Sequence, residues 1–411
     1  MEGVEVPPYF TCPISLQIMR DPVTISSGIT YDRESMEKWV FSYKNRACPV
    51  TKLPISDLTM TPNHTLRRLI QHWCTENAAL GVERIPTPKP PLDAATVLSL
   101  LNQADLPSLI RLRELASLSD RNKVCIRSAG AVKRLASFIH FLTQDAPSTP
   151  SGSGASTDGD RLPVIREALN LLCAVEVTED EVKDLAAANV DLIASLAWVL
   201  DKGDCQSRVQ ACFLLKTAFN GLHPMFLMNV RSDLLAGIVR VLRDQISLPA
   251  TKCAAQLLIE ASKWGRNRIK VVDCGAVPAL VEMLIETTER RMSEILMWLL
   301  DMLCGCAEGR AELLGHAAGI AVVSRKMMRV SQTTNDRAVR ILYSLCRYSA
   351  NPALAQEMLN IGAVSKLCLV LQVEGNNKTK EKAVEMLKMN ARTWRNSSCV
   401  PHHLLSGYPS N

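Results

Sequence analysis

The hydrophobic positions of this chain recur along most of its length with a period in the low forties. Six apolar runs follow one another at intervals of 43, 43, 41, 43 and 45 residues, and they begin at Ala168, Ala211, Ala254, Ile295, Ala338 and Ala383. A helical hairpin cannot bury its own apolar face, because that face needs a neighbour to cover it. A repeat of this length therefore predicts an α-solenoid.

A second register, taken from the turn that precedes an apolar run, gives the same period. Its six positions lie 61, 42, 42, 43 and 44 residues apart: Gly130, Asp191, Asp233, Gly275, Ala318 and Gly362. Glycine reaches left-handed dihedrals without a Cβ penalty, so we expect one helix to end and the next to begin at the three glycines. The Val and Leu residues that follow recur at i, i+3, i+4 and i+7, which places them on one helix face.

The interruptions of this pattern predict the domain organisation. The longest interval exceeds 42 by 19 residues and contains a segment rich in Ser, Gly, Pro and Thr, 145–160, which we expect to be disordered. Residues 81–91 hold four prolines in their last six positions and are interpreted as a semi-rigid linker. We expect a small domain at 5–80, the repeat array at 92–395 and a disordered tail at 396–411.

The small domain shows short elements of both kinds. Two strand-like segments at 23–26 and 29–31 flank a turn at Ser27-Gly28. Asp32 is placed to cap a helix that runs to about Ser42, and another helix starts near Asn63. The fold class is therefore mainly α, with a compact domain of short strands and helices ahead of the solenoid.

Composition excludes several classes of function. Apolar residues make up 47% of the chain but aromatic residues only 5%, which suits helices packed through Leu, Ala and Val. The net charge of +6 is not gathered in one arm, which argues against a nucleic-acid binder. No run approaches the ~20 apolar residues of a membrane span. Fourteen cysteines without an export signal predict reduced thiols and a cytoplasmic location, with the nucleus as a further compartment.

A domain this small raises the question of a structural metal. A RING zinc domain needs eight Cys or His ligands with paired C-x2-C spacing, whereas residues 1–80 offer Cys12, Cys48, His64, His72 and Cys74 without such a pair. We therefore expect no metal and no cofactor, and we expect the cysteines to be core thiols. Hydrogen bonds and ion pairs should replace the metal, and they are assigned to Asp21, Tyr31, Asp32, Arg33 and Asn63.

Both regions resemble known families. The array, with its aliphatic-x-x-Gly-Ala-Val-x-x-Leu pattern at the three glycines, resembles armadillo repeats. The N-terminal segment resembles the U-box, the zinc-free relative of the RING domain, through an ordered set of matches: Phe10, Cys12-Pro13-Ile14, Met19, Asp21-Pro22-Val23, Gly28, Thr30-Tyr31, Arg33, Trp39, Cys48-Pro49, Thr51, Leu58, Pro62-Asn63 and Leu66-Arg67. Together they resemble plant U-box ubiquitin ligases of the short branch, in which the box comes first.

The resemblance implies a RING-type ubiquitin ligase. The box would hold a ubiquitin-conjugating enzyme that carries ubiquitin as a thioester, the array would bring in a protein substrate, and the ligase would supply no nucleophile and form no covalent intermediate. The residues implied to contact the conjugating enzyme are Ile14, Leu16, Trp39 and Pro49. Ile14 and Trp39 could instead fill the core. Lys52 matches a basic residue that bridges ubiquitin and the conjugating enzyme, and a solvated lysine is the alternative.

The array lacks the asparagine ladder with which some armadillo proteins bind basic peptides. The equivalent positions include four polar side chains, which are our candidates for a substrate groove on the concave face: Thr217, Glu260, Asp301 and Ser344. Because two of them are acids, we expect a folded or acidic-tolerant protein partner. Plant stress or immune signalling is suggested by resemblance alone, and a homo- or hetero-oligomer stays open.

Two other functions compete with this interpretation. The first is a non-enzymatic armadillo scaffold whose degenerate box serves dimerisation, although an intact Ile14, Trp39 and Pro49 set argues against degeneracy. The second is a ligase that forms its own thioester. It would need a large catalytic lobe, and Cys304 and Cys306 lie inside a repeat, where packing is the simpler role.

Overall fold

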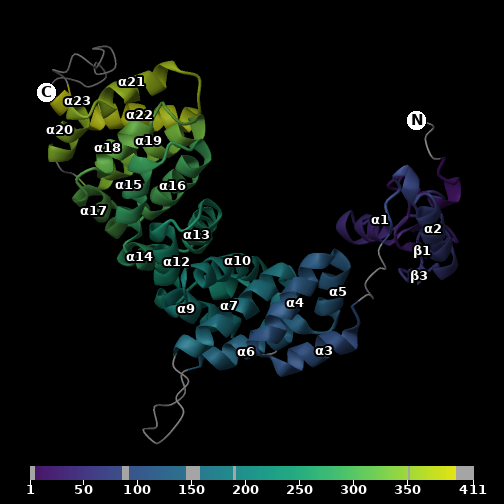
Figure 1. Ribbon diagram of the computed structural model, residues 1–411. Coiled ribbons are helices and arrows are strands. Elements are labelled where there is room, and N and C mark those ends of the chain that lie inside the picture. The colour runs from purple at the N-terminus through teal and green to yellow at the C-terminus, as the bar shows by residue number, and fades with distance from the viewer. Residues whose placement is uncertain (1–4, 86–91, 145–157, 188–190, 350–351, 395–411) are drawn as a thin grey trace, which may run out of the picture. The chain divides into compact units, whose positions relative to one another are not determined.

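The structure is a computed structural model that describes residues 5–85, 92–144, 158–187, 191–349 and 352–394. The chain divides into two compact units. One comprises residues 1–135 with 170–176, and the other comprises 136–169 with 177–411. Figure 1 shows the helices and strands of both units.

The N-terminal domain is built on a small antiparallel sheet. Its strands are β1 (Pro22–Thr24), β2 (Thr30–Asp32) and β3 (Thr61–Pro62), in the order β2-β1-β3. Val23 pairs with Tyr31 on one side and with Pro62 on the other. The helical elements are η1 (Pro8–Phe10), α1 (Arg33–Glu37), the π-helical segment η2 (Lys38–Ser42), α2 (His64–Glu76) and η3 (Ala78–Leu80). Both strands and both helices expected from the sequence are present.

Two helix starts in this domain differ in how they are capped. Asn63 caps α2 as expected, since its side chain accepts a hydrogen bond from the Leu66 N–H at 3.0 Å. Asp32 precedes α1 but makes no side-chain cap. Its Oδ1 instead accepts the backbone N–H groups of Arg20 and Asp21 at 2.8 and 3.0 Å. The expected cap at Asp32 is therefore wrong, because the preceding loop engages its carboxylate.

One core holds the domain together. Its fully buried members come from β1, β2, α1, α2 and the loops, and they include Cys12, Val23, Tyr31, Met36, Cys48 and Ile70. Val82 and Ile85 pack against this core from beyond η3. The chain thus remains part of the domain as far as Ile85, which shortens the linker expected at 81–91, and residues 86–91 lie outside the described residues.

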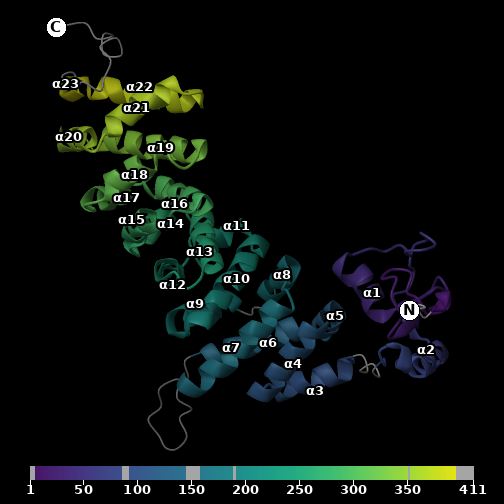
Figure 2. The ribbon, with the colours of Figure 1, turned by 45° about the horizontal axis from the view of Figure 1, so that its top comes forward.

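The remaining helices form the array, and Figure 2 shows them in a second view. The first unit contains α3 (Ala94–Gln103), α4 (Leu106–Leu118) and α5 (Asp120–Ser128). The helices α6 (Ala131–Thr143) and α7 (Asp158–Ala174) contribute residues to both units. The second unit continues through α8 (Glu179–Ala187), α9 (Leu192–Lys202), α10 (Cys205–Gly221), α11 (Pro224–Leu227), α12 (Ser232–Asp244), α13 (Leu248–Ala261), α14 (Gly265–Asp273), α15 (Ala276–Glu286), α16 (Arg290–Leu303), α17 (Ala307–Gly315), α18 (Gly319–Lys326), α19 (Gln332–Tyr348), α20 (Pro352–Asn360), α21 (Ala363–Gln372), α22 (Asn377–Met389) and α23 (Ala391–Trp394).

The repeat corners follow the sequence expectation at the glycines. Gly130, Gly275 and Gly362 have φ of +79°, +80° and +71°, the left-handed region in which a side chain would be strained. At Asp191 the helix begins with a side-chain cap in place of a glycine, because the Asp191 carboxylate accepts the Ala194 N–H of α9 at 2.8 Å. The aspartate register position therefore replaces glycine without changing the period.

In the second unit the last helices of successive repeats pack side by side. Contacts join α10 to α13, α13 to α16, α16 to α19 and α19 to α22. We call the surface they form the third-helix face. Ion pairs link neighbouring repeats along it, with Arg208 bonded to Asp244 and Lys252 to Glu289. Cys304 is buried in this packing, as expected for a core thiol.

The two segments expected to be disordered, 145–160 and 396–411, lie mostly outside the described residues. Helix α7 starts at Asp158, so the last three residues of the segment 145–160 are helical. Residues 145–157 and the tail 396–411 lie outside the described residues. Among the described helices none alone has the length and hydropathy of a membrane span, and one pair bent by 72°, Ala353–Asn360 with Ala363–Gln372, meets those criteria jointly.

Candidate functional site

Two loops of the N-terminal domain close in the same way. In the first, the Leu16 N–H donates to the carbonyl of Cys12 at 2.9 Å, and in the second the Lys52 N–H donates to the carbonyl of Cys48 at 2.9 Å. Leu16 and Lys52 both take positive φ, +57° and +61°. The segments 12–17 (CPISLQ) and 48–53 (CPVTKL) therefore form two loops that close in the same conformation.

A buried cysteine lies at the base of each loop and accepts hydrogen bonds. The Cys48 sulfur is 3.0 Å from the Tyr31 hydroxyl and 3.3 Å from that of Ser27, and the Thr51 N–H points to it at 3.4 Å. The Cys12 sulfur accepts the Asp32 N–H at 3.3 Å. Each thiol thus ties its loop to the sheet, which is the position that a cross-link would take in a domain of this size.

These contacts shift the pKa of both partners. Burial, and after it the hydrogen bond to Cys48, raises the pKa of Tyr31. Burial also disfavours ionisation of Cys48, but the hydrogen bonds from Ser27, Thr51 and Tyr31 outweigh it and lower the pKa of Cys48 to about 6.

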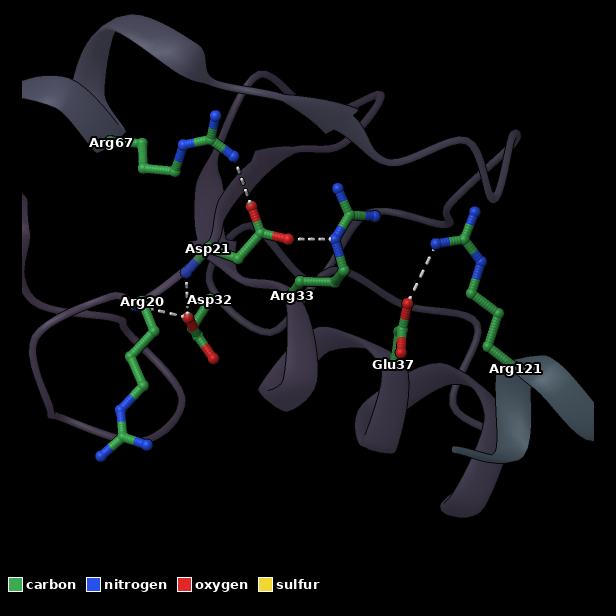
Figure 3. A network of polar contacts seen from close by, with 7 residues as sticks. All are labelled: Arg20, Asp21, Asp32, Arg33, Glu37, Arg67 and Arg121. Carbon is green, nitrogen blue, oxygen red and sulfur yellow. Dashed lines mark hydrogen bonds and ion pairs between the residues drawn. The ribbon is translucent and has the colours of Figure 1, made fainter. Parts of the chain in front are cut away.

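Charged side chains make the second set of cross-links (Figure 3). Asp21 accepts a hydrogen bond from the Arg33 Nε and lies 3.8 Å from an Arg67 guanidinium nitrogen. The Arg33 N–H donates to the Asp21 carbonyl at 2.9 Å. One carboxylate therefore joins the first loop to α1 and α2. Within the described ranges no group of three or more His, Cys, Asp or Glu residues is arranged to hold a metal ion.

The elements α1 and η2 run on from one another as the central helix of the domain, and Trp39 on η2 lies beside the second loop. The indole Nε1–H donates to the carbonyl of Ala47 at 2.8 Å, which sets the ring orientation, and the ring packs partly against the domain core. Ile14 is half-buried on the same core. Both residues therefore pack against the core, which is one of the two alternatives from the sequence, and each keeps part of its surface accessible.

The other candidate contacts are more accessible. Leu16 is 77% exposed, Pro49 is half-buried and Lys52 is exposed. Leu16 also lines a cavity of about 440 Å³ together with Val82 and Ile85. Leu16 therefore also forms part of the wall of this cavity.

The structure adds two apolar groups that sequence reasoning missed. Val50 is 51% exposed and Leu53 is 62% exposed on the second loop. Val50 stands two residues after Cys48, as Ile14 stands two after Cys12. Aligning the two loop sequences with each other would have found it.

A contact between the central helix and α5 was also missed. Glu37 on α1 pairs with Arg121 on α5 at 3.1 Å, and the Ser42 hydroxyl donates to the Asp120 carboxylate. Burial raises the pKa of Glu37, and the hydrogen bond from Arg121 opposes that shift. No local motif signals such a pair, because its members lie 84 residues apart in the sequence.

The four groove candidates of the array do not form one free surface. Asp301 is buried and pairs with Arg337 at 3.0 Å and Arg340 at 3.2 Å, so its expected role as an accessible acid is wrong. Glu260 pairs with Lys263, and the Ser344 hydroxyl donates to the Cys304 carbonyl at 3.1 Å.

Comparisons with known proteins agree with this architecture. Residues 6–79 match the family model of the U-box domain, and residues 94–410 match that of the plant U-box protein ARM repeat region. E3 ubiquitin-protein ligase PUB23 of Arabidopsis thaliana is 46% identical over 99% of this chain and 98% of its own length. E3 ubiquitin-protein ligase PUB22 of the same plant is 45% identical over the full length of both chains.

A solved structure shares the fold at low sequence identity. It comes from a study of a phosphorylation switch that controls the interaction between cadherin and beta-catenin, and it covers 80% of this chain and 59% of its own, with 13% identity and a TM-score of 0.54. This likeness concerns the fold alone.

Proposed function

Because this chain belongs to the plant U-box ubiquitin ligase family with armadillo repeats, we propose that its U-box binds a ubiquitin-conjugating enzyme loaded with ubiquitin. The array then recruits a protein substrate, and ubiquitin passes to a substrate lysine. The observation that carries this proposal is the pair of matched loops beside Trp39, because they hold apolar side chains accessible on a hydrogen-bonded frame.

The contact surface for the conjugating enzyme consists of apolar groups on rigid supports. Ile14, Leu16, Pro49 and Val50 come from the two loops, and Trp39 is oriented by its bond to Ala47. A few apolar anchors of this kind provide most of the affinity in small interfaces. Their pre-organisation reduces the entropy that binding costs.

The chemistry proposed is positioning rather than covalent catalysis. The domain's three cysteines, Cys12, Cys48 and Cys74, are buried, which favours direct transfer from the conjugating enzyme over a thioester on the ligase. The rate gain would come from proximity and from restraint of the tethered ubiquitin in a geometry open to attack. Exposed Lys52, next to these anchors in the second loop, is the group proposed to contact ubiquitin.

Reconstitution tests the proposal. The full chain is incubated with activating enzyme, a panel of conjugating enzymes, ubiquitin and ATP, and self-ubiquitination is followed over time. We expect ubiquitin conjugates with a subset of the conjugating enzymes. Inactivity with every member of the panel, together with a dimer whose formation depends on the box, would favour the non-enzymatic scaffold instead.

A further inference from the structure

A basic pocket lies on the third-helix face where α19 meets α22. Its volume is about 240 Å³, and four of its lining residues are cationic: Arg337, Arg340, Lys378 and Lys382. The lining includes one acid, Asp336. We call this feature the basic pocket.

Asp301 and Trp298 hold the two arginines of the pocket in place. The buried carboxylate of Asp301 accepts from Arg337 at 3.0 Å and lies 3.2 Å from Arg340. The Arg337 guanidinium also stacks over Trp298, 4.8 Å from the ring centroid. The Arg340 side chain is still 51% exposed, so a positioned guanidinium faces solvent.

The nearby acids already have partners. Asp336 accepts a hydrogen bond from Thr379 at 2.8 Å and another from Gln332 at 3.3 Å. Four cations therefore face two carboxylates, those of Asp301 and Asp336, which leaves a surplus of two positive charges. The two arginines, which are fixed by Asp301, gain more from an incoming anion than mobile surface lysines do, because less side-chain entropy is lost.

Elsewhere on the third-helix face, three lysines have polar partners. Lys216 bonds to Gln256, Lys252 pairs with Glu289, and Lys263 pairs with Glu260. A nucleic acid would need positive charge along an extended track to follow its phosphates, and the pairing of Lys252 and Lys263 with carboxylates interrupts such a track. A single basic pocket beside a partly exposed Trp298 instead suits a short segment with both acidic and apolar side chains.

We propose that the basic pocket binds a segment of the protein substrate rich in Asp and Glu. The guanidinium of Arg340 is suited to a carboxylate through paired N–H donors, and Lys378 and Lys382 neutralise a second one. This inference rests on the proposed function, in which the array recruits the substrate. The sequence led us to expect an acidic-tolerant partner, and the inference narrows this to an acidic segment. The residues proposed to bind it are the arginines and lysines of the basic pocket, and not Glu260 or Asp301.

Peptide binding to the full chain tests the proposal. The probe is a fluorescein-labelled peptide in which Glu alternates with Ala, and the matched control peptide carries Gln in place of Glu. Anisotropy should show binding of the Glu peptide alone, weakening as salt rises. Arg340→Glu and Lys378→Glu should each weaken it by about tenfold or more. The matched control Arg266→Glu makes the same charge change at an exposed position on α14 and should leave the affinity unchanged.

Arg340 contacts a buried carboxylate, so Arg340→Glu could unfold the array. Lys378 is exposed, and Lys378→Glu therefore tests the pocket in a chain that should remain folded. Equal binding of the Glu and Gln peptides, or an equal loss with Arg266→Glu, would overturn the proposal. So would binding of a phosphoserine peptide or of single-stranded RNA in place of the Glu peptide. Ubiquitin discharge by the wild-type chain is assayed separately, so that failure of the ligase function is distinguished from failure of the pocket.

Discussion

At the scale of single residues, hydrogen bonds and ion pairs of polar side chains connect the loops of the U-box to its strands and helices. The sequence motif was enough to predict that Asp21, Arg33 and Asn63 would be structural. It could not predict that Asp32 would bond to a loop instead of capping α1, nor that Asp301 would be buried. Both outcomes depend on donors that lie far away in the sequence, and no local pattern encodes them.

The first prediction concerns Leu16. Because its side chain is 77% exposed, Leu16→Ala should leave the melting temperature almost unchanged. It should nevertheless weaken binding of the conjugating enzyme by roughly 1 to 2 kcal/mol, as loss of an apolar anchor does. Titration calorimetry with the purified conjugating enzyme measures the effect. Leu69→Ala is the matched control, since Leu69 is also an exposed leucine of this domain, on α2.

At the scale of elements, the repeat period predicted the array well because glycine corners and apolar spacing are local signals. Gly130, Gly275 and Gly362 adopt the dihedrals expected of them. The contact of α1 and η2 with α5 was not predictable in this way, since it joins two regions of different character. It makes the first array helices part of the same compact unit as the U-box.

The second prediction concerns the Glu37–Arg121 pair. The Glu37 side chain is 13% exposed, so Arg121→Ala should leave a buried carboxylate unpaired and destabilise the first unit by about 1 to 3 kcal/mol at pH 7. Glu37→Gln in the same chain should recover most of that loss, because the amide carries no charge. Thermal unfolding of the two single variants and the double variant measures the coupling.

The same pair predicts a pH dependence. Burial raises the pKa of Glu37 in the folded state, so the ionised carboxylate opposes folding, and this cost grows as pH rises through the folded pKa. Arg121 offsets the cost in the wild-type chain. The loss of stability in Arg121→Ala should therefore be smaller near pH 4 than at pH 7. An equal loss at both pH values would show that the pair is not electrostatically important.

At the scale of the whole molecule, we propose that the U-box promotes ubiquitin transfer and that the array selects the substrate. The third prediction follows from the frame of the box, which rests on hydrogen bonds to Cys12 and Cys48 and on ion pairs of Asp21. Treatment of the purified chain with a strong chelator, which is removed before the assay, should leave both the melting temperature and the ligase activity unchanged. Loss of either, with recovery on adding zinc, would show that a metal supports the fold.

The most direct test of the central claim is a single-turnover discharge assay. A conjugating enzyme charged with ubiquitin is mixed with excess free lysine, with and without the full chain, and the loss of its thioester is followed on non-reducing gels. We predict that the chain accelerates discharge by about tenfold or more through positioning, with no thiol-sensitive adduct of ubiquitin on the chain itself. An unchanged discharge rate, or ubiquitin attached to the chain by a reducible bond, would contradict it.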